Sequence, residues 1–445
     1  MIRSRYTIYV SDFPSKGEHL FYNIRTQGLV VVDDALRRLV DSLPAEPSDR
    51  KTRKSLRELK KLGFLAPGPE QDRASLDAYF GELKIGPDSV QATVLTTYAC
   101  NFACTYCVEQ GVTAAVHMDA ETAVETARFI VARARKQGAH SVFVSLYGGE
   151  PLMNLEALRI VLRETRSLAE EHGLEFGASM TTNGALLTPR LVDELAGYGL
   201  RGVKVTLDGD REHHNAKRPF RNGSGSFDVI MRNVEYAASR IDVDIGGNFD
   251  DENAASFPAL LDYLSERGLA SRLNRLNFKP ISEVPADRAR LHPNAELDCV
   301  YSRPETASTM VSLRRAIVDR GMPADPGIGV NLCGITLNGA HFTVDPKGML
   351  YRCPAFVGHP EFAVGDIRGG ETTTLTELDL WKRCADCAYI PLCGDGCMYG
   401  AYLRFGDPTR LNCQREYVEY VVRENLKAQY DESLRQPAPA AAGTP

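Results

Sequence analysis

The sequence has no apolar run long enough to cross a membrane and no strong excess of charge of either sign. Its 445 residues carry a net charge of −6 with a pI near 5.9, which gives no reason to expect nucleic acid as the main partner. No apolar run approaches the roughly 20 residues that span a bilayer. The start, MIRSRYTIYVSDF, lacks the apolar segment of an export signal. We therefore expect a cytoplasmic protein that has no membrane partner.

We also expect no disulfide bonds, because the cytosol keeps thiols reduced. The chain nevertheless has eleven cysteines, three of them at 100–107 and seven between Cys333 and Cys413, while Cys299 stands apart. Scattered buried thiols would not gather in this way. The clustering favours metal ligation.

The first 85 residues predict a small α+β module. The strand-like runs RYTIYV and GLVVVD, with HLFYNIRT between them, precede two helical patterns, ALRRLVDSL and KTRKSLRELKKLGFL. Strands followed by two short helices are typical of a compact unit of this class.

Residues 91–280 alternate six strand candidates with five amphipathic helices. This alternation predicts βαβ units and a parallel sheet, curled into a partial barrel or open and doubly wound. In both arrangements the chemistry belongs at the C-terminal ends of the strands, and the cysteine loop at 100–107 follows the first strand. We expect a bridge at 281–330, a cysteine-rich domain at 331–415 with a hairpin turn at DPKG, and a helix with a disordered tail at 416–445.

The first cysteine group, Cys100-x3-Cys104-x2-Cys107, places three thiolates within eight residues. Thiolates of this kind hold iron–sulfur clusters, and three of them on a four-iron cube leave one iron open. The spacing is not the C-x2-C of ferredoxins and zinc sites. A zinc site or a chance grouping are the alternatives.

From this motif onward, over about residues 91–415, the chain resembles the radical S-adenosylmethionine (SAM) superfamily. The resemblance implies a partial (β/α)6 TIM barrel and a [4Fe–4S] cluster whose open iron chelates SAM. It also implies reductive cleavage of SAM to methionine and a 5′-deoxyadenosyl radical, which abstracts a substrate hydrogen. An electron donor such as flavodoxin or ferredoxin is then required.

Two loops resemble the SAM-binding segments that follow the second and third strands of that superfamily. The stretch after the second strand resembles the GGEP motif, whose backbone receives the methionine amino group; its residues are Gly148, Gly149, Glu150 and Pro151. Thr182 and Asn183 end the third strand, where many relatives have the same Thr-Asn-Gly triplet. A simple Asn-Gly turn is the alternative for this pair.

Further SAM contacts are implied around the fourth strand. Thr206 and Arg218 resemble the hydroxyl that binds the SAM ribose and the guanidinium that binds its carboxylate. The resemblance places Tyr106 beside the adenine, chiefly through its backbone. His213 and His214 in the same loop are interpreted as solvated.

The later cysteines resemble the SPASM extension of radical SAM enzymes, which holds two auxiliary [4Fe–4S] clusters. The resemblance assigns one cluster to Cys384, Cys387, Cys393 and Cys413. It assigns the other to Cys333, Cys353 and Cys397. The fourth ligand of this second cluster is either Cys299 or an open position for solvent or substrate. Zinc is the alternative for the whole region.

SPASM relatives generally modify peptides or proteins. An anaerobic sulfatase-maturing branch has an Asp after the equivalent of Cys353, where this chain has Pro354, and Asp345 lies on the wrong side of the hairpin turn. That branch generally lacks an N-terminal addition of this kind. We therefore expect a maturase that makes a thioether, carbon–carbon or carbon–oxygen crosslink, or an oxidised residue, in a ribosomally made precursor peptide.

The N-terminal module resembles the winged-helix-like units that dock a precursor peptide as an added strand. Its two predicted helices fall short of the three in that pattern. An iron–sulfur scaffold for binding or electron transfer is the alternative from another class. The catalytic side chain that acts on the substrate stays unknown.

Overall fold

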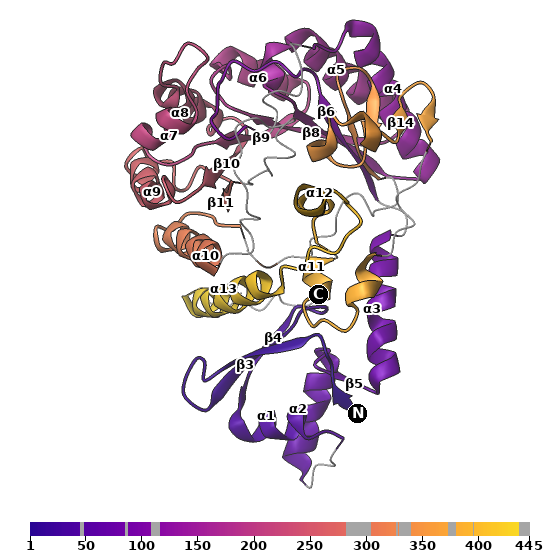
Figure 1. Cartoon of the computed structure of the whole chain (residues 1–445), viewed down its shortest axis with the longest axis vertical. Helices are drawn as coiled ribbons and strands as arrows, with labels where there is room; N and C mark the ends of the chain where they lie inside the picture. The colour runs from indigo at the N-terminus through magenta and orange to yellow at the C-terminus, as the bar shows by residue number, and fades with distance from the viewer. Residues whose placement is uncertain are drawn as a thin grey trace, which may run out of the picture.

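The computed structural model describes residues 1–44, 49–84, 88–107, 116–281, 304–325, 328, 340–372, 380–394 and 396–435. The predicted ligands Cys299 and Cys333 lie outside these residues. Figure 1 shows a strand-and-helix barrel at one end, the N-terminal unit at the other end, and the C-terminal helices between them. No helix of the described residues is both long and apolar enough to span a membrane.

Six parallel strands form the body of the barrel in the order of the chain. They are β6 (Ser89–Leu95), β7 (Ser141–Tyr147), β8 (Glu175–Thr182), β9 (Leu200–Thr206), β10 (Asp242–Phe249) and β11 (Arg275–Pro280). Buried apolar residues alternate along them, as Val142, Val144 and Leu146 do in β7. Because β11 does not pair with β6, the sheet remains open, and the predicted partial barrel is confirmed.

Five main helices cover the outer face of this sheet (Figure 1). They are α4 (Ala120–Gln137), α5 (Leu155–Glu171), α6 (Pro189–Gly197), α8 (Phe227–Ala237) and α9 (Phe257–Glu266). The sequence determines where these helices start. The Asp119 carboxylate caps α4 by accepting from the backbone N–H of Thr122. Thr188 caps α6, and Pro189 occupies its first helical position.

The cysteine-rich region extends the same sheet, which the sequence did not reveal. Strand β12 (His341–Val344) pairs in parallel with β6, and β13 (Met349–Tyr351), β14 (Gly365–Asp366) and β15 (Gly370–Glu371) follow antiparallel. The predicted hairpin is the β12–β13 pair. The bridge contains α10 (Pro304–Asp319), and the chain after it forms the α-helices α11 (Ile390–Cys393), α12 (Met398–Phe405) and α13 (Arg415–Arg435).

The N-terminal unit is built on an antiparallel sheet of β2 (Thr7–Ser11), β3 (Glu18–Asn23) and β4 (Gly28–Asp33). The short strands β1 (Ile2–Arg3) and β5 (Leu65–Ala66) pair with each other. Its helices are α1 (Asp34–Asp41), α2 (Arg50–Lys61) and α3 (Pro69–Lys84). The prediction of two helices was wrong, since α3 is a third.

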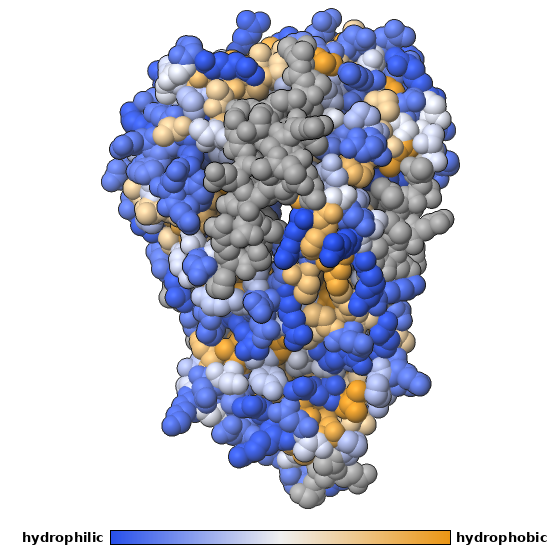
Figure 2. Space-filling view, viewed as in Figure 1, coloured by the Kyte–Doolittle hydropathy of each residue, from blue (hydrophilic) through white to orange (hydrophobic). Residues whose placement is uncertain are grey.

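Helix α3 forms because it has a partner far along the chain. Its Leu76 and Phe80 are buried with Tyr6 against Trp381 of the cysteine-rich region. One face of the β2–β3–β4 sheet likewise packs on residues of that region and on α13, Val422 among them. Figure 2 shows a mostly hydrophilic face with apolar side chains gathered around the middle of the molecule, where Figure 1 places α12.

Candidate functional site

A cavity of about 320 Å³ opens at the C-terminal ends of the barrel strands. Its lining includes all three cysteines of the first motif and most of the predicted SAM-contact residues: Cys100, Cys104, Cys107, Tyr106, Gly148, Gly149, Thr182, Asn183, Thr206 and Arg218. The structure thus brings together residues that are more than a hundred positions apart in the sequence.

The cysteine loop between β6 and α4 presents its thiols to this cavity. Cys104 is buried, and the Sγ of Cys100 accepts a hydrogen bond from the backbone N–H of Phe102. Burial raises the pKa of Cys100 and of Cys104 to about 11. Among the described residues, no three His, Cys, Asp or Glu side chains converge on a point that would suit a single metal ion.

The loop after β7 fits against the cysteine loop only because it begins with two glycines. A Cβ on Gly148, whose φ is +139°, would lie 2.4 Å from the carbonyl oxygen of Thr97. A Cβ on Gly149 would lie 2.4 Å from the carbonyl oxygens of Tyr98 and Ala99. These glycines therefore allow the loop after β7 to pack closely against the backbone of the cysteine loop.

Glu150 lies behind the cavity wall and does not line it. Its carboxylate is fully buried and accepts from the Thr182 hydroxyl and from the Asn183 backbone N–H, each at 2.8 Å. Burial raises the pKa of Glu150. Pro151 begins a 3-10 turn, and its carbonyl accepts from the Thr96 hydroxyl. Both residues hold the loops that form the cavity.

Thr182 and Asn183 have bonds beyond those of a simple turn. The Asn183 amide donates to the Oδ1 of Asn101 in the cysteine loop at 2.7 Å. Thr206, at the end of β9, is paired in register with Gly246 of β10 and also lines the cavity.

A buried hydrogen-bond network occupies the far wall. The Tyr106 hydroxyl donates to Asp208 and accepts from Arg218 Nη1 at 2.7 Å and from Asn248 Nδ2 at 2.9 Å. The Arg218 guanidinium also lies 3.8 Å from the Asp208 carboxylate. Sequence reasoning placed Tyr106 by its backbone and missed this role of its side chain, together with Asp208 and Asn248.

Arg218 retains an unused donor in this network. Its Nε is buried and has no hydrogen-bond partner among the described residues. A buried guanidinium N–H without an acceptor is costly, so the site suits an anionic ligand such as a carboxylate. Three cavity-facing thiols and this unpaired N–H form a donor set that fits a cluster with SAM bound beside it.

His214 corrects one expectation. The sequence suggested solvated histidines, but His214 is fully buried. Its Nδ1 accepts from the backbone N–H of Asp208 at 3.1 Å, and its Nε2 lies 3.0 Å from the Ser226 hydroxyl. Burial lowers the pKa of His214 well below its ordinary value. His213 is partly exposed beside Asp210, as expected for a loop histidine.

Residues 94–264 match the sequence profile of the Radical SAM superfamily. This part of the chain is a radical SAM domain. Among relatives, the mycofactocin maturase MftC of Mycolicibacterium smegmatis is 26% identical over 322 residues, covering 68% of this chain and 76% of MftC. The Fe-coproporphyrin III synthase of Methanosarcina barkeri is 27% identical over 52% of each chain.

Solved structures share the fold of this radical SAM protein. Native anSMEcpe with bound AdoMet superposes with a TM-score of 0.60 at 17% identity, over 78% of this chain and 98% of that one. Streptococcus suis SuiB bound to S-adenosylmethionine gives a TM-score of 0.55 at 14% identity, over 93% of this chain and 99% of that one.

The cysteine-rich region lies next to the radical SAM cavity. Tyr147 lines the cavity and also packs in an apolar cluster with Cys353 and Tyr399. The same cluster contains Met398, the residue that follows Cys397, so these two predicted ligands of one auxiliary cluster lie in one part of the structure.

Two of the other predicted auxiliary ligands, Cys384 and Cys387, pack against the N-terminal unit. Cys384 and Cys387 share one turn, in which the Cys387 N–H donates to the Cys384 carbonyl, and α11 ends at Cys393. Cys413 is exposed just before α13. Asp345, at the hairpin turn, accepts from the Tyr98 hydroxyl at 2.7 Å and from two backbone N–H groups. Its carboxylate is thus occupied by structural bonds.

Proposed function

We propose that this protein is a radical SAM maturase of a ribosomally made peptide, with a SPASM-type C-terminal region. The observation that carries the proposal is the cavity where three thiols face Arg218, whose Nε lacks an acceptor. A bound [4Fe–4S] cluster with SAM would supply a 5′-deoxyadenosyl radical there. The radical would take a hydrogen from the peptide.

The chain's own residues then have distinct tasks. Cys100, Cys104 and Cys107 would hold the cluster, and Arg218 would bind the SAM carboxylate with its unpaired N–H. The Thr206 hydroxyl faces the cavity, where it can bind the ribose. Glu150 and the Tyr106 network fix these walls by buried hydrogen bonds, so the groups need little reorganisation when SAM enters.

Two auxiliary [4Fe–4S] clusters are part of the proposal. One of them is supported by Cys353, which packs with Tyr147 of the cavity and with Met398, the residue after Cys397. The turn of Cys384 and Cys387 supports the other, farther along the chain. A flavodoxin- or ferredoxin-like protein would supply electrons, and the cysteine usage favours the cytoplasm.

The peptide substrate is supported by the relative MftC, a mycofactocin maturase that is 26% identical to this chain. SuiB, which was solved with its precursor peptide SuiA, matches at 13% identity and supports the fold alone. The match to anSMEcpe does not favour the sulfatase-maturing alternative, because a likeness at 17% sequence identity supports the fold alone.

The N-terminal unit is proposed to dock the precursor. Its sheet ends in β2 and β4, and neither strand pairs with a further strand of the described residues. An extended peptide can add to such an edge through main-chain hydrogen bonds. The third helix α3 brings the unit closer to the winged-helix-like pattern than the sequence indicated.

Co-expression with a small peptide encoded near this gene, followed by mass spectrometry, tests the function. We expect a product about two hydrogens lighter per crosslink, from bond formation, and peptide-dependent release of 5′-deoxyadenosine. An unchanged peptide mass while SAM is consumed would contradict the proposal. Turnover of a short Cys- or Ser-containing sulfatase peptide would favour the alternative. If no 5′-deoxyadenosine formed under reducing, anaerobic conditions, the result would favour the alternative of a binding or electron-transfer scaffold.

A further inference from the structure

The radical SAM cavity contains two lysines that the SAM-binding residues do not account for. Lys204 of β9 and Lys279 of β11 both line it, together with Asn277 of β11. Side chains alternate across a strand, so Asn277 and Lys279 share the inner face of β11, as Lys204 and Thr206 share that of β9.

Gly246 of β10 makes room for one of these lysines. A Cβ at Gly246 would lie 2.5 Å from Cε and 3.4 Å from Nζ of Lys204. The Lys204 side chain therefore lies across the inner face of β10, the strand between β9 and β11. Lys279 of β11 is exposed and lines the same cavity from the other side of β10.

Neither ammonium forms an ion pair within the described part of the chain. Asp244, the register partner of Lys204, is paired with Arg275. Asp208, the acidic group that acts on Lys279, is bound to Tyr106 and Asn248 and lies against Arg218. Two like charges held near each other without a counter-ion leave the cavity locally positive, and an anion would be attracted there.

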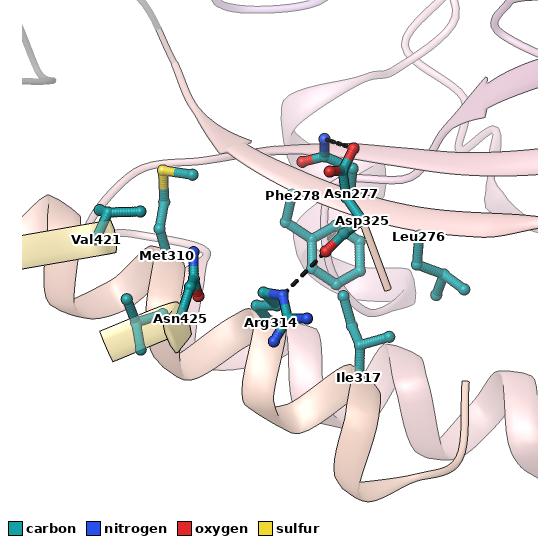
Figure 3. Close-up of a pocket in the computed structure, with 10 residues that line it drawn as sticks. Leu276, Asn277, Phe278, Met310, Arg314, Ile317, Asp325, Val421 and Asn425 are labelled. Atoms are coloured by element: carbon teal, nitrogen blue, oxygen red, sulfur yellow. Dashed lines mark hydrogen bonds between the residues drawn. The ribbon is translucent and has the colours of Figure 1, made fainter. Parts of the chain in front are cut away.

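The second pocket of the barrel shows the contrast. Leu276, Asn277 and Phe278 of β11 line a second, smaller cavity together with residues of α10 and α13 (Figure 3). Its cation, Arg314, is satisfied by the backbone carbonyl of Asp325 at 2.9 Å and by Glu432 at 3.1 Å. Lys204 and Lys279 have no such ion-pair partners among the described residues.

We propose that Lys204 and Lys279 bind a carboxylate of the substrate and thereby fix the position of its reacting residue beside SAM. The proposal rests on the proposed function and names the chemistry that the substrate must carry near the site of attack. SAM has a single carboxylate, and Arg218 already offers it an unpaired N–H. The second anion would be either the C-terminal carboxylate of a peptide or an Asp or Glu side chain.

Binding of model peptides to the reconstituted full chain with SAM tests this directly. Three probes suffice: N-acetyl-alanyl-phenylalanine, its C-terminal amide, and N-acetyl-glutamyl-phenylalanine amide. By equilibrium dialysis we expect an acid-bearing probe to bind about tenfold or more tightly than the neutral amide, as for a charge-assisted hydrogen bond. Which acid binds identifies the source of the carboxylate.

The variants K204M and K279M, and the pair together, should abolish this preference. The exposed Lys136 of α4 provides the matched control, K136M, which should retain it. The double Arg variant, which preserves both charges, should restore part of the preference. SAM binding, measured in the same samples, should stay within about twofold of the parent, which also shows that the site is folded.

Two results would overturn the inference. One is the absence of any acid preference in the parent protein, whether all probes bind or none does. The other is loss of SAM binding in K204M/K279M with Arg218 intact, which would assign the lysines to SAM. The binding test requires no turnover. A failure to find any peptide product would therefore count against the proposed function, but it would not change the binding result.

Discussion

The buried carboxylate of Glu150 accepts hydrogen bonds from both the hydroxyl of Thr182 and the backbone N–H of Asn183, each at 2.8 Å. Asn183 in turn donates to Asn101 at 2.7 Å. One carboxylate after β7 thereby fixes the end of β8, and through it the cysteine loop after β6. The three loops around the cluster site act as one structural unit.

Glu150→Ala should therefore destabilise the whole protein and its cluster site together. The change leaves several buried donors without an acceptor, and we expect a loss of about 3 kcal/mol in the free energy of unfolding. Urea unfolding measures it, and iron retention after desalting should fall in parallel. Glu156→Ala, at an exposed position in α5, is the control. Equal stability of E150A and the control would contradict the role assigned to Glu150.

Arg218 should determine SAM affinity. Replacing it by Met removes the guanidinium and leaves the Asp208 carboxylate buried without its cation. We expect SAM binding to weaken about 100-fold in R218M, and about tenfold in R218K, which preserves charge but loses the planar fork. Equilibrium dialysis with SAM checks both. Arg211, exposed in an ion pair with Asp228, provides the control R211M. Affinity of R218M within twofold of the control would refute the assignment.

Iron content should separate the three proposed clusters. The fully loaded protein should hold about twelve irons, four for each [4Fe–4S] centre, and C100A/C104A/C107A should retain about eight. The C384A/C387A variant should also lose about four, from the auxiliary cluster near the N-terminal unit. Colorimetric iron and sulfide analysis gives the counts. Retention of the full complement by the triple variant would show that the first motif is not a cluster site.

The alternation of strands and helices could be predicted because each barrel segment contains its own signal. Val142, Val144 and Leu146 mark a buried strand, and Asp119 or Thr188 marks the start of a helix. The first motif and the loop of Gly148 and Gly149 were likewise visible as local spacings. These features depend on neighbours in the sequence. The fold confirms the alternation of strands and helices, and it brings the first motif and the glycine loop to one cavity.

Features that depend on distant partners could not be predicted in the same way. Helix α3 is stabilised by Trp381, about three hundred residues later, and its own pattern gave a weak signal. The pairing of β12 with β6 is equally remote. Lys204 of β9 and Lys279 of β11 are separated by β10, and only the three-dimensional arrangement of the sheet brings them to one cavity.

The single tryptophan reports on the contact between α3 and the cysteine-rich region. Trp381 is buried and stacks on Phe80 with ring centroids 4.6 Å apart. Phe80→Ala should expose the indole, shift its fluorescence emission to longer wavelength, and lower the free energy of unfolding by about 3 kcal/mol. Phe405→Ala, in α12, is a control aromatic deletion outside this cluster. An unshifted emission in F80A would show that the N-terminal unit does not pack on this region.

His214 should make stability fall in mild acid. Burial lowers its pKa well below the ordinary value in the folded protein, whereas the unfolded chain protonates near pH 6.5. The unfolded state therefore binds more protons below that pH. This contribution to stability is complete above about pH 6.5, and roughly 2 kcal/mol should be lost by pH 5.

The variant His214→Asn should reduce that slope, since its amide oxygen can accept from the Asp208 N–H but does not titrate. Urea unfolding between pH 5 and pH 8 measures the profile, and we expect H214N to be less stable than the parent at pH 7 because the bond to Ser226 is lost. The exposed His172 supplies the control H172N, which should follow the parent. If H214N retained the parent's full acid sensitivity, the proton uptake would have to come from other groups. His214 would then have a purely structural role in holding Asp208 beside Tyr106.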